Sequence, residues 1–205
     1  VQDDVADGMI DMLAGAMDAL SLGDPMDLAT DVGPVIDDAA CAMLGAHVAR
    51  MNREARLIKA CTLPDGCRKG SFFAPHLFEI DSLDQLEREV FGPILHVVRY
   101  RPEDLPRVLD AIRRTRYGLT LGIHSRIEAR AAEIHNALDV GNTYVNRNMV
   151  GAVVGVQPFG GQGLSGTGPK AGGPHYLYRF ATEKTLTVNT AATGGNAALF
   201  CLSED

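Results

Sequence analysis

The chain has 205 residues and a formal net charge of −7, and these two figures already exclude several classes of protein. Acidic residues outnumber basic ones and no basic run is present, which argues against a nucleic-acid-binding surface. The longest apolar stretches are far shorter than a membrane span, and residues 1–8 carry no signal-peptide pattern. We therefore expect a cytoplasmic globular protein without a membrane-spanning segment.

The first half of the chain predicts two helices followed by two strands. Apolar residues recur at helical spacing in each helix, and a loop rich in Gly and Pro separates them. Ser82, with Gln85 three residues later, predicts a capping box at the start of a further short helix, which ends at 91–93. The expected elements are, in order, a helix at 4–20, a helix at 38–55, a strand at 56–61 and a strand at 71–80.

Strands and helices alternate in the second half, which favours an α/β fold with a parallel sheet covered on both faces. Ligands of such sheets bind beyond the carboxyl ends of the strands, and a glycine-rich segment follows one of these ends, after Asn146. The expected elements are a strand at 94–100, a helix at 103–115, a strand at 119–124, a helix at 126–138 and a strand at 143–146.

The glycine-rich segment is the most informative part of the sequence, because nine of the 22 glycines lie between Gly151 and Pro174. Residues 161–166 read GQGLSG and match the dinucleotide pattern G-x-G-x-x-G, but the prolines that follow prevent a helix from starting there. Residues 163–170 also depart from the phosphate-loop pattern. The segment is therefore expected to be a rigid loop that is either structural or lines a pocket.

The cysteines and histidines carry little functional signal. Cys61 and Cys67 flank a turn with cations nearby, which would favour a nucleophilic thiol, but ordinary reduced loop thiols are the preferred interpretation. Cys41 and Cys201 form no C-x-x-C pair either, and the six histidines have no metal-ligand spacing. We expect no bound metal.

Three separated motifs resemble those of the NAD(P)-dependent aldehyde dehydrogenases. Residues 89–93 read EVFGP and resemble the E-x-F-G-P motif, and residues 117–119 read YGL. The sequence PFGG at 158–161, followed by SG at 165–166, resembles the late glycine loop of the family. The longer match, NRNMVGAVVGVQPFGG and then SGTGPKAGGPHYL, is similar to the pyrroline-5-carboxylate dehydrogenases, in particular to that domain of bacterial bifunctional proline utilization A.

The resemblance implies a three-layer, parallel-sheet catalytic domain that is incomplete here. The family's nucleophile segment G-Q-x-C-S and general-base segment E-L-G-G-x are both absent, so no catalytic residue is assigned. We expect the nucleophile's strand to precede Val1, and a longer enzyme to contain this chain. Residues 1–181 are then the C-terminal part of the catalytic domain, and 182–205 an oligomerisation strand and tail. The apolar alternation at 185–190 marks the strand that would form a homo-oligomer.

Site residues also follow from the resemblance. Glu89 is expected to accept hydrogen bonds from the ribose hydroxyls of NAD, and Phe91 to pack beside that ribose. Gly151 and Ala152 stand where the family anchors the α-carboxylate of L-glutamate γ-semialdehyde through backbone N–H groups. Phe159 resembles the aromatic residue that packs against the substrate's aliphatic part, although plain core packing explains it equally well.

Two other functions remain open from the sequence. The chain is compatible with a piece of another semialdehyde dehydrogenase, although the anchor segment NMVGAVVG speaks against this. It is also compatible with a non-catalytic assembly or interaction module, because it lacks the nucleophile. The upstream reading frame distinguishes these cases, since an in-frame G-Q-x-C-S before Val1 indicates an enzyme.

Overall fold

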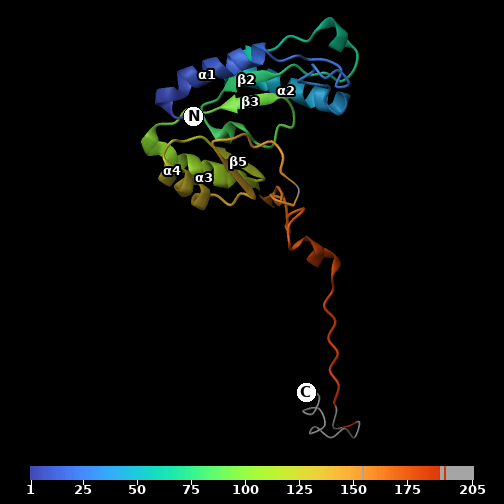
Figure 1. Cartoon of the computed structure of the whole chain (residues 1–205). Coiled ribbons are helices and arrows are strands. Elements are labelled where there is room, and N and C mark those ends of the chain that lie inside the picture. Colours follow the sequence, from blue (N-terminus) through green and yellow to red (C-terminus); the bar gives the residue numbers. More distant parts are fainter. Residues whose placement is uncertain (154, 190–191, 193–205) are drawn as a thin grey trace.

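The structure, a computed structural model, describes residues 1–153, 155–189 and 192. The helices are α1 (Asp3–Asp18), α2 (Asp38–Glu54), α3 (Leu105–Thr115) and α4 (Glu128–Ala137), with short 3-10 helices η1 (Asp65–Arg68), η2 (Leu83–Gln85), η3 (Pro102–Asp104) and η4 (Tyr176–Phe180). The strands are β1 (Arg56–Ala60), β2 (His76–Glu79), β3 (Ile94–Val97), β4 (Tyr117–Gly118), β5 (Thr120–Ile123), β6 (Asn142–Val145) and β7 (Gln162–Gly163). Figure 1 shows a body of two halves, with α1, α2, β2 and β3 in one and α3, α4 and β5 in the other, and a C-terminal segment, which includes η4, that runs away from this body.

The first half is built around β2, which pairs antiparallel with β1 and parallel with β3. Neighbouring residues of a strand point to opposite faces of the sheet. Leu77 of β2 packs with Ile10 of α1, whereas Phe78 packs with Met51 of α2. All four side chains are at most 5% exposed. The two helices therefore cover the two faces of this sheet.

The second half contains a parallel pair, β5 and β6, connected through α4. Its core is a cluster of Leu105, Leu109 and Leu138, each buried. The short strand β4 pairs antiparallel with β7, with Tyr117 opposite Gly163 and Gly118 opposite Gln162. This pairing brings the glycine-rich segment back to the end of α3.

The four longer expected helices are confirmed with small changes in their bounds, whereas the short helix expected from Ser82 to 91–93 is formed only as η2. The helices expected at 4–20 and 38–55 are α1 and α2, and those expected at 103–115 and 126–138 are α3 and α4. The capping box is confirmed as well: the Ser82 hydroxyl accepts from the Asp84 N–H at 3.1 Å, and Gln85 Oε1 accepts from the Ser82 N–H at 3.2 Å. Over the described residues, no helix combines the length and the apolar composition needed to cross a membrane.

The expectation of one parallel sheet is wrong in two respects. Over the residues that the structure describes, the strands form three separate sheets, and only the strand pairs β2–β3 and β5–β6 are parallel. β1 is antiparallel to β2 because the connection 61–75 turns the chain back without a helix crossing over the sheet. The strand expected at 71–80 shortens to β2, which begins directly after Pro75, a residue with no N–H to donate to a ladder.

The glycines of the segment 160–166 are packed against backbone atoms. A Cβ atom on Gly161 would lie 2.5 Å from the carbonyl oxygen of Ser165, and one on Gly166 would lie 2.6 Å from that of Gly161. Neither distance leaves room for a side chain. The segment contains β7 and no helix follows it before η4, so the dinucleotide-loop interpretation is excluded. Close packing of the chain on itself accounts for these glycines.

The C-terminal segment forms neither helix nor strand over 181–189. Leu186 and Val188 are 85% and 58% exposed, and Figure 1 shows this segment extended away from the body. The strand expected at 185–190 is thus not formed within one chain, and Thr190 lies outside the described residues. Its pairing with a second subunit and the proposed domain boundary at 181 stay predictions.

Candidate functional site

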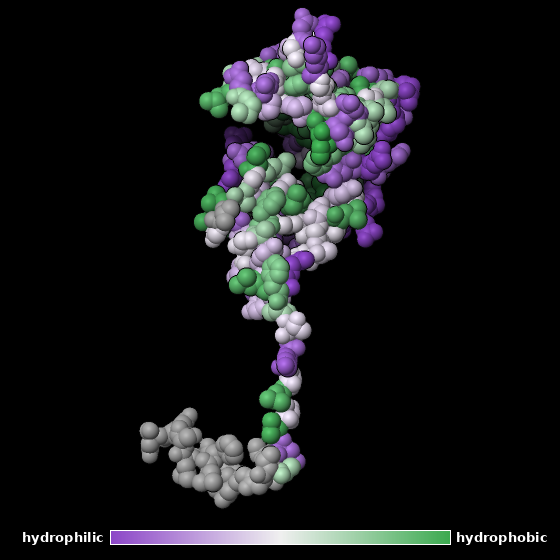
Figure 2. All heavy atoms as spheres, turned by 90° about the vertical axis from the view of Figure 1, so that its right-hand side faces the viewer, coloured by the Kyte–Doolittle hydropathy of each residue, from purple (hydrophilic) through white to green (hydrophobic). Residues whose placement is uncertain are grey.

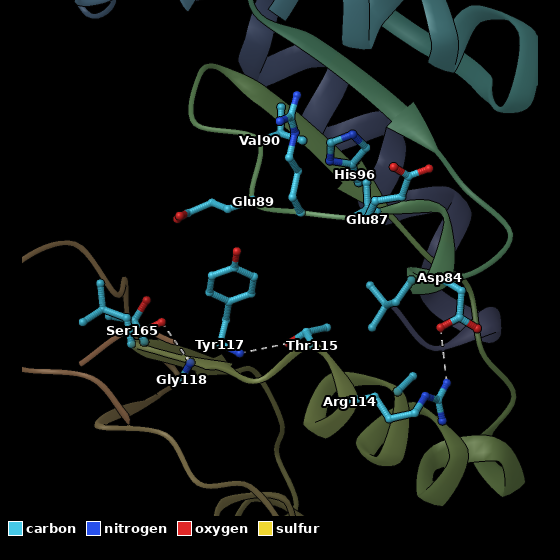
Figure 3. Close-up of a pocket in the computed structure, with 16 residues that line it drawn as sticks. Asp84, Glu87, Glu89, Val90, His96, Arg114, Thr115, Tyr117, Gly118 and Ser165 are labelled. Carbon is cyan, nitrogen blue, oxygen red and sulfur yellow. Dashed lines mark hydrogen bonds and ion pairs between the residues drawn. The ribbon is translucent and has the colours of Figure 1, made fainter. Parts of the chain in front are cut away.

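A cleft of about 590 Å³ opens between the two halves of the body (Figure 3). One wall is the segment 83–90, which links β2 to β3, together with His96. The other wall is the last turn of α3, the residues 117–120 and Ser165. All three segments that resemble the aldehyde dehydrogenase motifs therefore contribute to this one cleft. Figure 2 shows the body hollowed between its halves, with apolar side chains in part of the hollow.

Glu89 and Tyr117 belong to opposite walls of this cleft. The ring of Tyr117 rises from β4 toward the segment that carries Glu89, and the Glu89 side chain extends into the space beside it (Figure 3). Glu89 is exposed and makes no hydrogen bond or ion pair with any residue that the structure describes. Its carboxylate can therefore accept hydrogen bonds from a ligand, and a pair of neighbouring hydroxyls matches its two oxygens.

The segment that follows Glu89 in this wall packs closely against α2. A Cβ atom on Gly92 would lie 2.5 Å from both terminal methyl carbons of Leu44, which is fully buried. The carbonyl of Pro93 accepts a hydrogen bond from the His76 N–H at 3.0 Å, so the chain enters β3 directly after this contact. The glycine and proline of the E-x-F-G-P motif therefore hold the Glu89 loop against the first half of the body.

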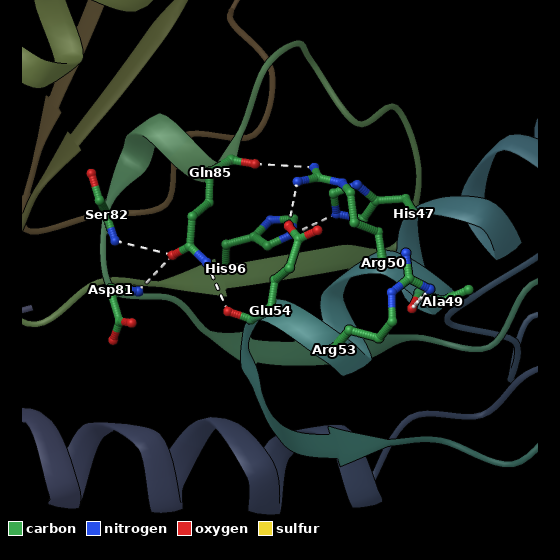
Figure 4. Close-up of polar contacts among 9 residues, drawn as sticks. All are labelled: His47, Ala49, Arg50, Arg53, Glu54, Asp81, Ser82, Gln85 and His96. Carbon is green, nitrogen blue, oxygen red and sulfur yellow. Dashed lines mark hydrogen bonds and ion pairs between the residues drawn. The ribbon is translucent and has the colours of Figure 1, made fainter.

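A network of polar contacts fastens the segment 81–85 to α2 (Figure 4). Arg50 donates to the Gln85 carbonyl at 3.0 Å and to the Glu54 carboxylate at 2.8 Å. The Gln85 side chain donates to the Glu54 carbonyl at 2.8 Å and accepts from the Asp81 N–H at 2.8 Å. Since Gln85 bonds through both ends of its amide, the wall is tied to the helix at several points.

A pair of histidines joins the same wall to β3. The Nε2 atoms of His47 and His96 are 2.9 Å apart, and the rings meet edge to face. The ring of His96 also stacks on Phe78. Burial is the main reason that the pKa of His96 is lowered to about 4, and the neighbouring His47 and Arg50 contribute to this lowering. His96 is therefore neutral at pH 7, and it faces the cleft without a charge.

Backbone contacts also shape the opposite wall. A Cβ atom on Gly118 would lie 2.4 Å from the carbonyl oxygen of Asp139, so this position of the YGL segment has no room for a side chain. The Gly118 N–H donates to the hydroxyl of Ser165 at 3.1 Å. The serine of the SG motif thus fixes β4 at the floor of the cleft.

The loop after β6 carries the predicted anchor, Gly151 and Ala152, and it does not line the cleft. Asn146 begins this loop with a φ of 54°. Its Oδ1 accepts from the Ser125 N–H at 2.9 Å, and its Nδ2 donates to the Ser125 carbonyl at 2.9 Å. Gly151 has a φ of 71°, a conformation that favours glycine, and the Tyr144 hydroxyl donates to its carbonyl at 3.0 Å.

The two predicted aromatic residues lie outside the cleft lining as well. Phe91 is 78% exposed, and Phe159 is partly buried. The Phe159 N–H and carbonyl pair with those of Ala171 at 3.0 Å and 2.9 Å. Of the five predicted site residues, Glu89 alone lines the cleft.

Most residues of the cleft were not predicted as site residues, among them Tyr117, Ser165 and His96. Tyr117 and Ser165 belong to motifs that carried the family resemblance, so a signal for them was present in the sequence. His96 had no such signal, because its partner His47 is 49 positions away in the sequence and neither stands in a motif.

The cysteines that the structure describes are poor candidates for a nucleophile. Burial raises the pKa of the Cys41 thiol, helped by the nearby carboxylates of Asp38 and Asp37. Burial also raises the pKa of the Cys61 thiol, against the opposing effect of Lys59. A raised pKa reduces the thiolate that would attack a substrate.

The remaining cysteines and possible metal ligands do not supply a reactive group to the cleft. Cys67 is buried, and Cys201 lies outside the described residues. Within the described part of the chain, no three His, Cys, Asp or Glu side chains are grouped so that they would hold a metal ion.

Comparison with known proteins supplies the remaining evidence. The model of the aldehyde dehydrogenase family matches residues 1–186. The bifunctional protein PutA of Escherichia coli is 49% identical over 199 residues, which cover 93% of this chain but 15% of that protein. The 1-pyrroline-5-carboxylate dehydrogenase of Geobacillus thermodenitrificans is 35% identical over 91% of this chain and 36% of its own length. A crystal structure of Bradyrhizobium japonicum proline utilization A superposes with a TM-score of 0.87 at 66% identity, over 95% of this chain and 20% of that one.

Proposed function

Because this chain belongs to the aldehyde dehydrogenase family, we propose that it forms part of an enzyme that oxidises L-glutamate γ-semialdehyde to glutamate with NAD. The substrate follows from the relatives, which are PutA proteins and 1-pyrroline-5-carboxylate dehydrogenases. The chain spans about a seventh of the first and about a third of the second, so the activity belongs to a longer protein. We place that protein in the cytoplasm.

The observation that carries the proposal is the meeting of the three family motifs at one cleft. Glu89 comes from the loop before β3, Tyr117 from β4 and Ser165 from the glycine-rich segment, yet all three line the same space. The Glu89 carboxylate is exposed there and has no partner among the described residues. These features fit the role of Glu89 as acceptor for the two ribose hydroxyls of NAD, with Phe91 beside that ribose.

When bound, NAD would accept the hydride that the substrate loses. The residues of this chain would orient it, because a carboxylate that accepts from both ribose hydroxyls fixes the rotation of that sugar. The thiols of Cys41 and Cys61 have raised pKa values, and the family's nucleophile and general-base segments are absent from the sequence. Both of those groups would therefore come from another part of the longer protein.

The substrate would be selected at the loop after β6. Gly151 and Ala152 present backbone N–H groups that bind the α-carboxylate of glutamate γ-semialdehyde, and Phe159 packs against the aliphatic part of that molecule. Ala152 has no hydroxyl, so the anchor consists of backbone donors. The positive φ of Gly151 supports this assignment, because it gives the loop a conformation that few other residues adopt.

The exposed C-terminal segment supports a second role, in assembly. Leu177, Phe180 and Leu186 are each at least 75% exposed, which is unusual for large apolar side chains that follow one another in the chain. We assign the segment 185–190 to a strand that pairs with the sheet of another subunit, giving a homo-oligomer.

The NAD role of Glu89 is tested in the full-length enzyme with Glu89→Gln. This change keeps the shape but removes the negative charge, so the KM for NAD should rise, or kcat should fall, by about tenfold or more. Glu103→Gln is the matched control, because Glu103 is exposed on η3 and does not line the cleft. NAD kinetics that are equal in the two variants would contradict the assignment of the cleft.

A further inference from the structure

We infer that Tyr144 is a positioning residue for substrate selection, because its hydroxyl orients the peptide group that joins Gly151 to Ala152. This inference rests on the proposed function, since that peptide is the proposed anchor of the substrate carboxylate. Tyr144 lies on β6, is 5% exposed and would not touch the substrate itself. It acts through the Gly151 carbonyl, to which it donates a hydrogen bond of 3.0 Å.

Through the geometry of the peptide bond, the contact between Tyr144 and the Gly151 carbonyl also orients the Ala152 N–H. A peptide group is planar and trans, so the carbonyl of Gly151 and the N–H of Ala152 point in opposite directions. A bond that holds the carbonyl toward the Tyr144 hydroxyl therefore directs the N–H away from it. Without the hydroxyl the peptide can rotate, because Gly151 is exposed and nothing lies within 4 Å of the place where its Cβ atom would be.

The donors of this turn are available to a ligand. Neither the Gly151 N–H nor the Ala152 N–H donates a hydrogen bond to any residue that the structure describes. The next donor along the chain is occupied, since the Val153 N–H donates to Gln157 Oε1 at 3.2 Å. Successive unoccupied N–H groups bind an anion such as a carboxylate when a turn that contains a left-handed residue makes them converge, and Gly151 has a φ of 71°.

The hydroxyl of Tyr144 ties the loop to β6 at Gly151. At the near end the loop is fixed by the two hydrogen bonds between Asn146 and Ser125. Between the two ends the chain is open to solvent, with Val150 85% exposed. The guanidinium of Arg147 lies 5.1 Å from the centre of the Tyr144 ring, which helps to hold that ring in place.

The test uses Tyr144→Phe in the full-length enzyme, because this change removes only the hydroxyl. The KM for glutamate γ-semialdehyde should rise about threefold to tenfold, as expected for one lost hydrogen bond. Inhibition by the product L-glutamate should weaken to a similar degree, because glutamate keeps the α-carboxylate. The KM for propanal, which has no carboxylate, and the KM for NAD should not change. Tyr100→Phe is the control, since the Tyr100 hydroxyl bonds to no residue that the structure describes.

The outcomes separate this inference from the proposed function. Wild-type enzyme should prefer glutamate γ-semialdehyde to propanal, and Gly151→Val should abolish that preference. Suppose that the wild type shows this preference and Gly151→Val loses it. If Tyr144→Phe then behaves like wild type, or loses activity equally on both aldehydes, the role of Tyr144 is wrong, while the assignment of Gly151 and Ala152 as the carboxylate anchor is retained. If the wild type shows no preference, or Gly151→Val affects both aldehydes equally, the anchor fails and the inference fails with it.

Discussion

The Nε2 atoms of His47 and His96 lie 2.9 Å apart, and this contact ties α2 to β3 beside the cleft. At this distance one imidazole donates an N–H hydrogen bond and the other accepts it, so the contact cannot form when both rings are protonated. Burial is the main reason that the pKa of His47 is lowered too, with Arg50 and Arg88 acting in the same direction and Glu54 against it. The pair thus makes this part of the structure sensitive to acid.

We predict that stability falls as the pH is lowered from about 6.5 to about 4. The pKa of His96 is about 4 in the folded protein, against about 6.5 in an unfolded chain, so the unfolded state binds more protons in this window. Above about 6.5 the contribution is fully present, and below about 4 it is lost. Urea unfolding midpoints of the full-length enzyme, measured from pH 7 to pH 4, check this prediction.

His96→Gln supplies the comparison for that experiment, because glutamine does not titrate. The variant should show a smaller change of midpoint with pH than the wild type. His124→Gln, at an exposed histidine, should keep the wild-type dependence. An unchanged pH dependence in His96→Gln would contradict the prediction.

Gly118 should tolerate no larger residue. Gly118→Ala places a Cβ atom 2.4 Å from the carbonyl oxygen of Asp139, so one of the two backbone segments must move, at a cost of about 1–3 kcal/mol. Gly45→Ala is the control, since Gly45 lies inside α2 with nothing within 4 Å, and alanine should stabilise the helix by about 0.5–1 kcal/mol. Melting temperatures that shift in the same direction in both variants would count against this packing.

Gly151→Val should impair the enzyme selectively. Valine disfavours a φ of 71°, so the turn should change and kcat/KM for glutamate γ-semialdehyde should fall about 30- to 1,000-fold. Propanal should be affected much less. Gly155→Val is a matched control in the same loop, because Gly155 has a φ of 79° and an equally open surrounding. Equal loss of selectivity in both variants would show that strain anywhere in this loop impairs substrate selection, and that Gly151 has no specific role.

The exposed C-terminal segment should determine the size of the oligomer. Deleting the chain from Thr185 onward in the full-length enzyme removes the alternating Leu186 and Val188. Because these residues are exposed and make no strand within the chain, the deletion should reduce the oligomeric mass while the melting temperature changes little. Light scattering measures the mass of the particle and so the number of subunits in it. A number of subunits equal to that of the wild type would refute the role.

The isolated chain should show no aldehyde dehydrogenase activity. Its described cysteines have the properties of structural thiols, and the sequence lacks the family's nucleophile and base segments. NADH formation from glutamate γ-semialdehyde, followed by absorbance, measures this directly. Turnover above the rate without protein would require a nucleophile within these 205 residues.

Local features of the fold were predictable and long-range pairings were not. The bounds of α1 and α2 and the capping box at Ser82 follow from spacing and from capping residues, which act within a few positions of the chain. The antiparallel direction of β1 and the separation of the strands into three sheets depend on contacts between distant segments, for which one sequence carries no local signal.

In the candidate site, too, local features could be predicted and long-range contacts could not. Glu89 was predicted because it stands in a motif, and the structure places it in the cleft. The bond from Tyr144 to Gly151 and the pair of His47 with His96 were not predicted, because each depends on how strands and loops are arranged in space. The glycine-rich segment was recognised as rigid, but only the structure shows that its glycines pack on one another's backbone.

The double hydrogen bond between Asn146 and Ser125 restricts which mutations this gene can accept. Position 146 requires a short side chain that both donates and accepts a hydrogen bond, on a backbone with a φ of 54°. Asparagine meets both requirements, and few other residues do. Aspartate would set an oxygen against the Ser125 carbonyl, and glycine would lose both bonds. A saturation library selected for growth should therefore retain asparagine at this codon. Deamidation of Asn146 in stored protein would introduce the same defect slowly, without any change in the DNA.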